Sequence, residues 1–95
     1  MVYLARFEEI DGELFRFDTR IYLNGYDATK PSKFIGAIVG KNPGSATPAE
    51  LGKFVPLELK NDKMLPTVRN RFLDAHKLAR KQIPENSFVR VWNLF

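Results

Sequence analysis

The residues best suited to chemistry form one short polar segment, Gly-Lys-Asn-Pro-Gly-Ser-Ala, at positions 40–46. An apolar run, Phe34–Val39, precedes it, which predicts a turn at the carboxyl end of a strand, where open α/β sheets bind ligands. Asn42 can hold a water molecule or a substrate carbonyl group there, although its amide cannot act as a strong base. Pro43 fixes one φ angle and Gly44 permits conformations that other residues avoid, so the following backbone N–H groups can bind an anion.

The same segment also fits a purely structural role. In that alternative it is a tight turn between a strand and a helix, and Asn42 caps only its own backbone. A phosphate loop is excluded, because the spacing Gly-x-x-x-x-Gly-Lys-Ser/Thr is missing. In the functional interpretation Asn42 is the central polar group, and Lys41 binds an anion together with the backbone of Pro43, Gly44 and Ser45.

Charge is divided unevenly along the chain. Residues 1–29 carry three Arg against six Asp and Glu, a net charge of −3, whereas residues 30–95 carry twelve Lys and Arg against five Asp and Glu, a net charge of +7. The total is +4. A basic two-thirds suits a polyanion such as nucleic acid or a nucleotide. A solvated, lysine-rich surface is the alternative, and charge alone leaves both open.

The amino-acid composition narrows the possible classes of protein further. The 95 residues are 44% hydrophobic and 27% charged, which is typical of one globular domain, 1–95. The chain has no cysteine and one histidine, so we expect no disulfide, no metal site and no cofactor. No apolar run has the length of about 18–20 residues that a membrane span needs, and the charged N-terminal segment does not resemble a signal peptide. We therefore expect a cytoplasmic protein without membrane contact.

The N-terminal third predicts an acidic β-hairpin, 1–29. Val2–Phe7 and Leu14–Leu23 are rich in strand formers, and the Asp-Gly pair at 11–12 between them is a strong hairpin signal. Strict alternation in the second strand would bury one face, which comprises Phe15, Phe17, Thr19 and Ile21.

The remaining residues, 34–95, predict a basic βαβ unit. The apolar run at 34–39 indicates a central strand covered on both faces, Thr47–Glu50 has the pattern of a helix start, and a longer helix is expected from about Pro66 to Gln82. Ser87–Phe95 is a second strand, and the crossover favours parallel pairing. The predicted fold class is α/β, with a small, mostly parallel sheet, flanking helices and the N-terminal hairpin.

A strand that ends the chain at Leu94-Phe95 would either bury the charged carboxyl terminus or leave a sheet edge open. We therefore expect these residues to be the front part of a larger fold, or a second copy of the chain to cover the exposed C-terminal strand as a homo-oligomer.

The segment Phe34–Gly44 resembles the first active-site motif of the uracil-DNA glycosylase superfamily, most of all the Gly-Ile-Asn-Pro-Gly of its mismatch-specific branch. A longer stretch, from about Phe34 to Phe95, is similar to the bacterial and phage domain of unknown function DUF sixteen-forty-three. In that family an apolar strand leads to Asn-Pro-Ser-x-Ala, then to Asp with Thr-x-Arg, a helix and a final Asn-Leu-Phe. The matching residues here are 42–46, Asp62, 67–69 and 93–95.

The glycosylase resemblance implies specific roles. Asn42 would position the water that attacks the sugar carbon, and Phe54 stands at the spacing of the aromatic residue that stacks on the flipped base. The helix sequence Asn70-Arg71-Phe72 echoes that of the same branch. The resemblance also implies the front part of a glycosylase-like three-layer fold.

The sequence departs from that family at two places and lacks a third feature. Lys41 replaces an apolar residue, no carboxylate occupies the position of the Asp that the fastest uracil glycosylases keep, and the second motif would lie beyond Phe95. We therefore leave open whether the chain is an enzyme. If it is one, it is a glycosidic-bond hydrolase of the DNA glycosylase type that is incomplete within these residues, and no robust glycosylase activity is expected.

Three residues outside the motif complete the list of candidate functional residues. Arg69 could contact phosphates or belong to a solvated helix face, and Asn93 could share a crevice with Asn42, because both would follow strand ends. Trp92 is expected to pack in the core or against a partner rather than to stack on a base. The sequence thus predicts a domain that binds nucleic acid or a nucleotide. The alternative is a non-catalytic interaction or structural domain.

Overall fold

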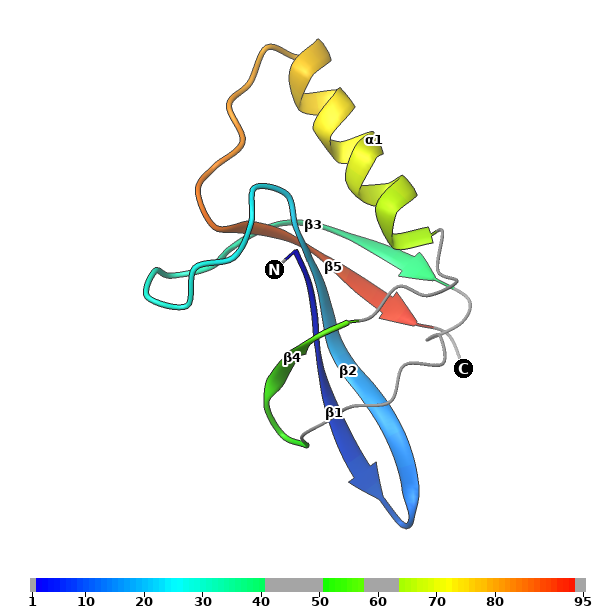
Figure 1. Cartoon of the computed structure of the whole chain (residues 1–95). Coiled ribbons are helices and arrows are strands. Elements are labelled where there is room, and N and C mark those ends of the chain that lie inside the picture. Colours follow the sequence, from blue (N-terminus) through cyan, green and yellow to red (C-terminus); the bar gives the residue numbers. More distant parts are fainter. Residues whose placement is uncertain (1, 41–50, 58–63, 94–95) are drawn as a thin grey trace.

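A computed structural model of the chain describes residues 2–40, 51–57 and 64–93. Their elements are, in order, β1 (Tyr3–Ile10), β2 (Glu13–Tyr22), β3 (Lys33–Gly40), β4 (Phe54–Pro56), α1 (Met64–Leu78) and β5 (Ser87–Asn93). Figure 1 shows α1 above the sheet and the β1–β2 hairpin extending away from it. The helix start predicted at 47–50 lies outside the described residues.

The strands form one mixed sheet in the order β3-β5-β2-β1-β4. Only β3 and β5 are parallel, whereas β5–β2, β2–β1 and β1–β4 are antiparallel. The α/β class and the N-terminal hairpin are confirmed, but the prediction of a mostly parallel sheet with several helices is wrong for the described chain. The connection from β3 to β5 gives the one parallel pair of the described sheet, and β2 of the hairpin pairs with β5 in the antiparallel sense.

The predicted central strand is an edge strand. β3 pairs with β5 alone within the described sheet, and its Phe34 and Val39 side chains are 51% and 58% exposed. The run is apolar on both faces, but α1 packs against only one of them. Of the two alternatives for the C-terminal strand, the open sheet edge is wrong, because β5 lies between β3 and β2.

A bulge in β2 changes which of its residues are buried. Leu4 pairs with Arg20 but Arg6 pairs with Phe17, so β2 has one extra residue there, and Asp18 has a φ of 48°. Thr19 and Ile21 are buried as predicted. On the other side of the bulge Arg16 is buried and Phe17 is 39% exposed, the reverse of the prediction, whereas Phe15 is half-buried.

Helix α1 ends earlier than its apolar pattern suggests. Arg80 has a left-handed φ of 54°, the Lys81 N–H donates to the carbonyl of His76, and the Arg80 N–H donates to that of Lys77. These bonds form a Schellman motif, which ends the helix at Leu78 without a glycine. No helix in the described part of the chain is both long and apolar enough to cross a membrane.

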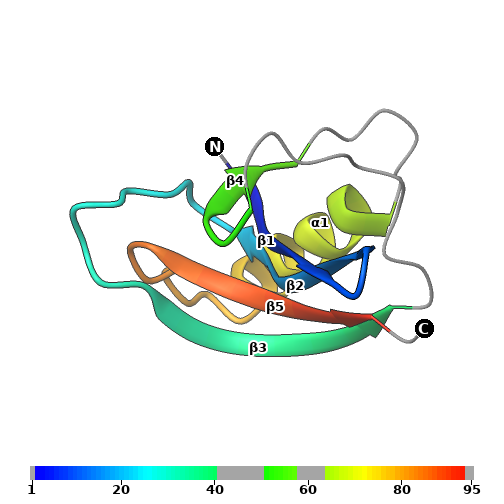
Figure 2. The same ribbon diagram turned by 90° about the horizontal axis from the view of Figure 1, so that it is seen from below.

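The two faces of the sheet have different cores. Below α1, Leu65 of the helix packs with the buried residues Ile21 and Leu23 and with Val89 and Val91 of β5. On the opposite side, Leu4, Tyr22 and Phe88 form a smaller cluster with Tyr26 of the loop after β2. We call this opposite side the helix-free face; on β3 and β5 it comprises Phe34, Ala37, Val39, Phe88, Arg90 and Trp92. Figure 2 gives the view of the sheet from below.

Candidate functional site

The carboxyl ends of β3 and β5 meet at one point. Gly40, the last residue of β3, is the Cα partner of Asn93, the last residue of β5. The five predicted motif residues, which are Lys41, Asn42, Pro43, Gly44 and Ser45, lie outside the described residues. In the sequence only Lys41 separates Gly40 from Asn42. The backbone of Asn93 therefore lies beside the strand end from which the Asn-Pro-Gly segment continues, as expected for a parallel pair.

Trp92 is an exposed residue next to this point. Its Cα partner is Val39 of β3, and the two residues are 55% and 58% exposed. Val91 before it is buried below α1, so the alternation of β5 places Trp92 on the helix-free face. Trp92 is thus not part of the core. Sequence reasoning missed its exposure because a tryptophan inside an apolar strand resembles a core residue.

Arginine side chains lie between aromatic rings on the helix-free face. The guanidinium carbon of Arg20 is 4.4 Å from the ring centre of Phe54 and 4.2 Å from that of Phe88. The guanidinium of Arg90 is 5.4 Å from the ring centre of Phe34. These cation–π contacts connect β4, β2, β5 and β3, and a partly desolvated contact of this kind is worth about 1–2 kcal/mol.

Asp18 holds both arginines in place. Its carboxylate accepts two hydrogen bonds from Arg20, at 2.9 and 3.1 Å, and one from Nε of Arg90 at 3.0 Å. Burial disfavours the charged carboxylate, but the hydrogen bonds and charges of Arg20 and then Arg90 outweigh it, so the pKa of Asp18 lies below its ordinary value. Asp18 makes these contacts from the bulge of β2, where its φ is 48°.

Phe54, the predicted stacking residue, lies away from the strand ends. It is on β4, 37% exposed, and Arg20 lies over its ring. The other ring beside Arg20 belongs to Phe88, which is five residues, or about 17 Å of strand, from Asn93. The described geometry therefore brings Phe54 to Arg20 and not to the carboxyl ends of β3 and β5.

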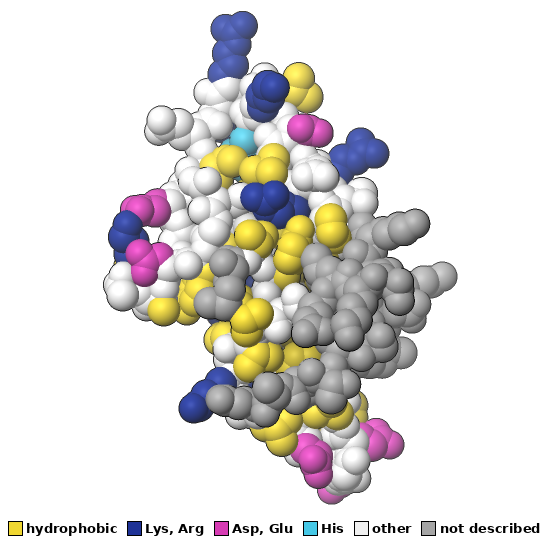
Figure 3. All heavy atoms as spheres, viewed as in Figure 1, with side chains coloured by type: hydrophobic (Ala, Val, Ile, Leu, Met, Phe, Trp, Pro, Cys, Tyr) yellow, Lys and Arg dark blue, Asp and Glu magenta, His cyan; other side chains and the backbone are white. Residues whose placement is uncertain are grey.

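Arg69 has a defined contact within the chain. Its Nη2 group donates to the carbonyl oxygen of Leu23 at 3.0 Å, which ties α1 to the end of β2. The exposed cations of this region lie farther along α1 and in the turn after it, at Arg71, Lys77, Arg80 and Lys81. Figure 3 shows dark blue side chains around this end of the molecule and magenta ones at the hairpin tip.

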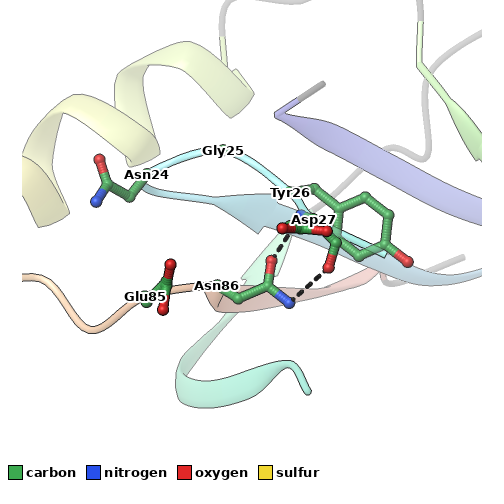
Figure 4. Close-up of a pocket in the computed structure, with 6 residues that line it drawn as sticks. All are labelled: Asn24, Gly25, Tyr26, Asp27, Glu85 and Asn86. Carbon is green, nitrogen blue, oxygen red and sulfur yellow. Dashed lines mark hydrogen bonds between the residues drawn. The ribbon is translucent and has the colours of Figure 1, made fainter. Parts of the chain in front are cut away.

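A second polar region lies under the loop between β2 and β3. The open pocket there has a volume of about 240 Å³ and is lined by Asn24, Gly25, Tyr26, Asp27, Glu85 and Asn86. Figure 4 shows the buried Asn86 amide bonded to the backbone of Asp27, whose N–H donates to Oδ1 at 2.8 Å. Nδ2 donates to the carbonyls of Asp27 and Lys30, at 3.1 and 3.0 Å. Asn86 therefore fastens the loop to the start of β5.

Two charged contacts at the rim of this pocket are structural. Lys30 bonds the carboxylate of Glu85, and Asp27 accepts bonds from the backbone and hydroxyl of Thr29. These two bonds from Thr29 lower the pKa of Asp27 below its ordinary value. Within residues 2–40, 51–57 and 64–93 there is no group of three or more His, Asp or Glu that could hold a metal ion.

Comparison of the chain with protein-family models, with curated proteins and with solved structures finds no match.

Proposed function

We propose that this chain binds nucleic acid or a nucleotide at the carboxyl ends of β3 and β5, where the Asn-Pro-Gly segment continues from β3. The pairing of Gly40 with Asn93 is the observation that carries the proposal. It means that the segment begins at the shared end of the one parallel pair in the described sheet, and ligands of open α/β sheets bind at such ends.

The chemistry of the segment supports a phosphate-bearing ligand. Lys41 supplies a positive charge, and the backbone after Pro43 supplies N–H donors for an anion. Asn42 can accept and donate hydrogen bonds, which suits either a base edge or a bound water molecule. The net charge of +7 over residues 30–95 favours the approach of a polyanion.

The likeness to uracil-DNA glycosylases extends the proposal to the ligand and the fold. A strand, an Asn-Pro-Gly segment and a later helix follow one another in that superfamily, and β3, the segment and α1 have the same order here. This order supports a nucleobase-containing ligand and a sheet related to the front part of the glycosylase fold.

Titration of labelled oligonucleotides tests the proposal. Single-stranded and duplex DNA, with and without uracil or a mismatch, are titrated at low and moderate salt and followed by fluorescence anisotropy. We expect affinity to fall steeply with salt, and Lys41→Ala to reduce the slope of log affinity against log salt by about 0.7–1. Lys33→Ala is the matched control, because it makes the same change at the opposite end of β3. Absence of binding at low salt contradicts the proposal.

A second function is favoured by the edge of the sheet. β3 is eight residues long, has no strand on its outer side among the described residues, and exposes Phe34 and Val39. Such an edge can pair with a strand of another protein or of a second copy. Binding of this kind does not depend steeply on salt, so the same titration, repeated with light scattering to measure the oligomeric state, separates the two functions.

A further inference from the structure

We propose that the ligand is single-stranded nucleic acid, that its bases stack on Trp92 and Phe34 of the helix-free face, and that Arg90 of the same face binds a phosphate. This inference rests on the proposed function, because it names the class of nucleic acid and a second set of contacts. All of its residues belong to the described part of β3 and β5.

The three side chains share one face. Phe34 is the Cα partner of Phe88, Ala37 that of Arg90 and Val39 that of Trp92, and side chains of paired residues lie on the same side of a sheet. The neighbouring residues Val89 and Val91 are buried against α1 on the other side. Phe34, Val39 and Trp92 are each more than half exposed.

Arg90 is held in a fixed orientation beside the ring of Phe34. Its Nε donates to Asp18 at 3.0 Å, and its guanidinium lies 5.4 Å from the ring centre of Phe34. Among the described residues no hydrogen bond occupies its two Nη groups, and the side chain is 32% exposed. These groups can therefore meet a phosphate, and little side-chain entropy is lost because the arginine is already ordered.

The charge of this face favours nucleic acid over an apolar protein partner. Asp18 neutralises one of the two arginines that it binds, so the group of Asp18, Arg20 and Arg90 keeps one net positive charge. A purely apolar partner would have to cover this charge without a counterion, at a desolvation cost. A nucleic acid strand supplies phosphates for the arginine and flat bases for the rings.

The dimensions of the face favour a single strand. Phe34 pairs with Phe88, which is four residues from Trp92, so the backbone positions of the two aromatic residues are about 13 Å apart along the strands. Sheets that bind single-stranded RNA stack about two or three bases on their aromatic residues. In a duplex the flat faces of the bases are covered by their neighbours and cannot reach these rings.

The fluorescence of Trp92 gives a direct test, because it is the one tryptophan of the chain. Unlabelled single-stranded oligonucleotides are titrated into the whole protein at low salt, and tryptophan emission is followed. In parallel, anisotropy of labelled oligonucleotides gives affinities for the wild type, Trp92→Ala, Trp92→Phe and Phe34→Ala. The matched control is Leu78→Ala, which truncates an 85% exposed apolar residue on α1. Circular dichroism shows that each variant is folded.

Base stacking predicts a defined pattern. Single strands should quench Trp92 and bind at least about tenfold tighter than duplex, and Trp92→Ala should weaken binding about tenfold or more. Trp92→Phe should restore most of the affinity, and Leu78→Ala should change it less than about twofold. An abasic strand of equal length should neither quench Trp92 nor respond to Trp92→Ala.

Each contrary result overturns the inference in a recognisable way. Suppose that binding depends on salt, that Trp92 is not quenched, and that Trp92→Ala has the same affinity as the wild type. This result contradicts the stacking surface but leaves the proposed function intact. Equal affinity for duplex and single-stranded DNA also contradicts the stacking surface and leaves the proposed function intact. Absence of binding to every nucleic acid at low salt overturns the inference together with the proposed function.

Discussion

Gly40 and Asn93 lie directly opposite each other at the ends of β3 and β5, and this pairing joins two segments that are far apart in the sequence. Both strands run in the same direction, so the Asn-Pro-Gly segment that follows β3 in the sequence begins beside the end of β5. The exposed pair Val39 and Trp92 lies one residue before this point. The proposed ligand site and the proposed stacking surface are therefore neighbours on the same two strands.

Replacing Asp18 by asparagine should destabilise the fold. The change removes the negative charge that both Arg20 and Arg90 bind but keeps a residue that tolerates the left-handed φ of the bulge. Because charge-assisted hydrogen bonds are worth about 1.5–3 kcal/mol, we expect Asp18→Asn to lower the free energy of unfolding by about 2–3 kcal/mol in urea titrations. Asp74→Asn, at an exposed position of α1, is the control and should change it by less than about 0.5 kcal/mol.

The same carboxylate predicts a pH dependence. Arg20 and Arg90 overcome the effect of burial and hold the pKa of Asp18 below its ordinary value of 3.8. The stabilisation is therefore complete above that ordinary value and is lost as the pH falls through the lowered pKa of the folded state. Urea titrations from pH 6 down to about pH 2 should show the loss in the wild type and a smaller loss in Asp18→Asn. Equal slopes in both proteins would show that Asp18 does not contribute.

Asn86 should stabilise the fold through both its side chain and its backbone conformation. Asn86→Gly keeps the φ of 55° but removes the hydrogen bonds that the buried side-chain amide makes with the N–H of Asp27 and with several carbonyls. We therefore expect the free energy of unfolding to fall by about 2–3 kcal/mol. Asn86→Ala should cost about 1 kcal/mol more, because alanine disfavours this φ. Asn24→Ala, at an exposed residue lining the same pocket, is the control. If glycine and alanine are equivalent, the backbone argument is contradicted.

Gly36 marks the closest approach of β3 to α1. A Cβ atom at this position would lie 3.2 Å from Cε1 of Phe72, which is closer than most such contacts. Gly36→Val should therefore push the helix away or force the ring to shift, at a cost of about 1–3 kcal/mol. Ala37→Val adds bulk at the next residue of the same strand, which faces the helix-free side, and should cost less than Gly36→Val. A smaller cost for Gly36→Val than for Ala37→Val would contradict this packing.

The sequence could predict the elements but only part of their arrangement. The Asp-Gly turn indicates the hairpin, and the three- and four-residue spacing of Leu65, Val68 and Phe72 indicates the helix, because both signals are local. The position of β3 is different. Its apolar residues alternate between a face that α1 covers and a face that no described element covers, and composition alone does not distinguish the two.

Two further differences have local causes that the residue types conceal. The bulge at Asp18 reverses the burial of Arg16 and Phe17, and an aspartate in a strand does not by itself indicate a left-handed residue. Likewise, Arg80 occupies the helix-ending position that glycine usually takes, so the helix pattern runs on past its true end. The exposure of Trp92 depends on the long-range pairing of β3 with β5, which no local pattern gives.

Chemical-shift mapping by NMR tests the central claim most directly, because a chain of 10.9 kDa gives well-resolved amide spectra. Isotope-labelled protein is titrated with a short single-stranded oligonucleotide at low salt. The Lys33→Ala variant is titrated in the same way as a folded control. We predict that the largest changes fall on the amides of Val39, Gly40, Trp92 and Asn93 and on the indole N–H of Trp92. Changes confined to the hairpin tip or to the basic end of α1, or the absence of changes, would contradict a nucleic-acid site at the ends of β3 and β5.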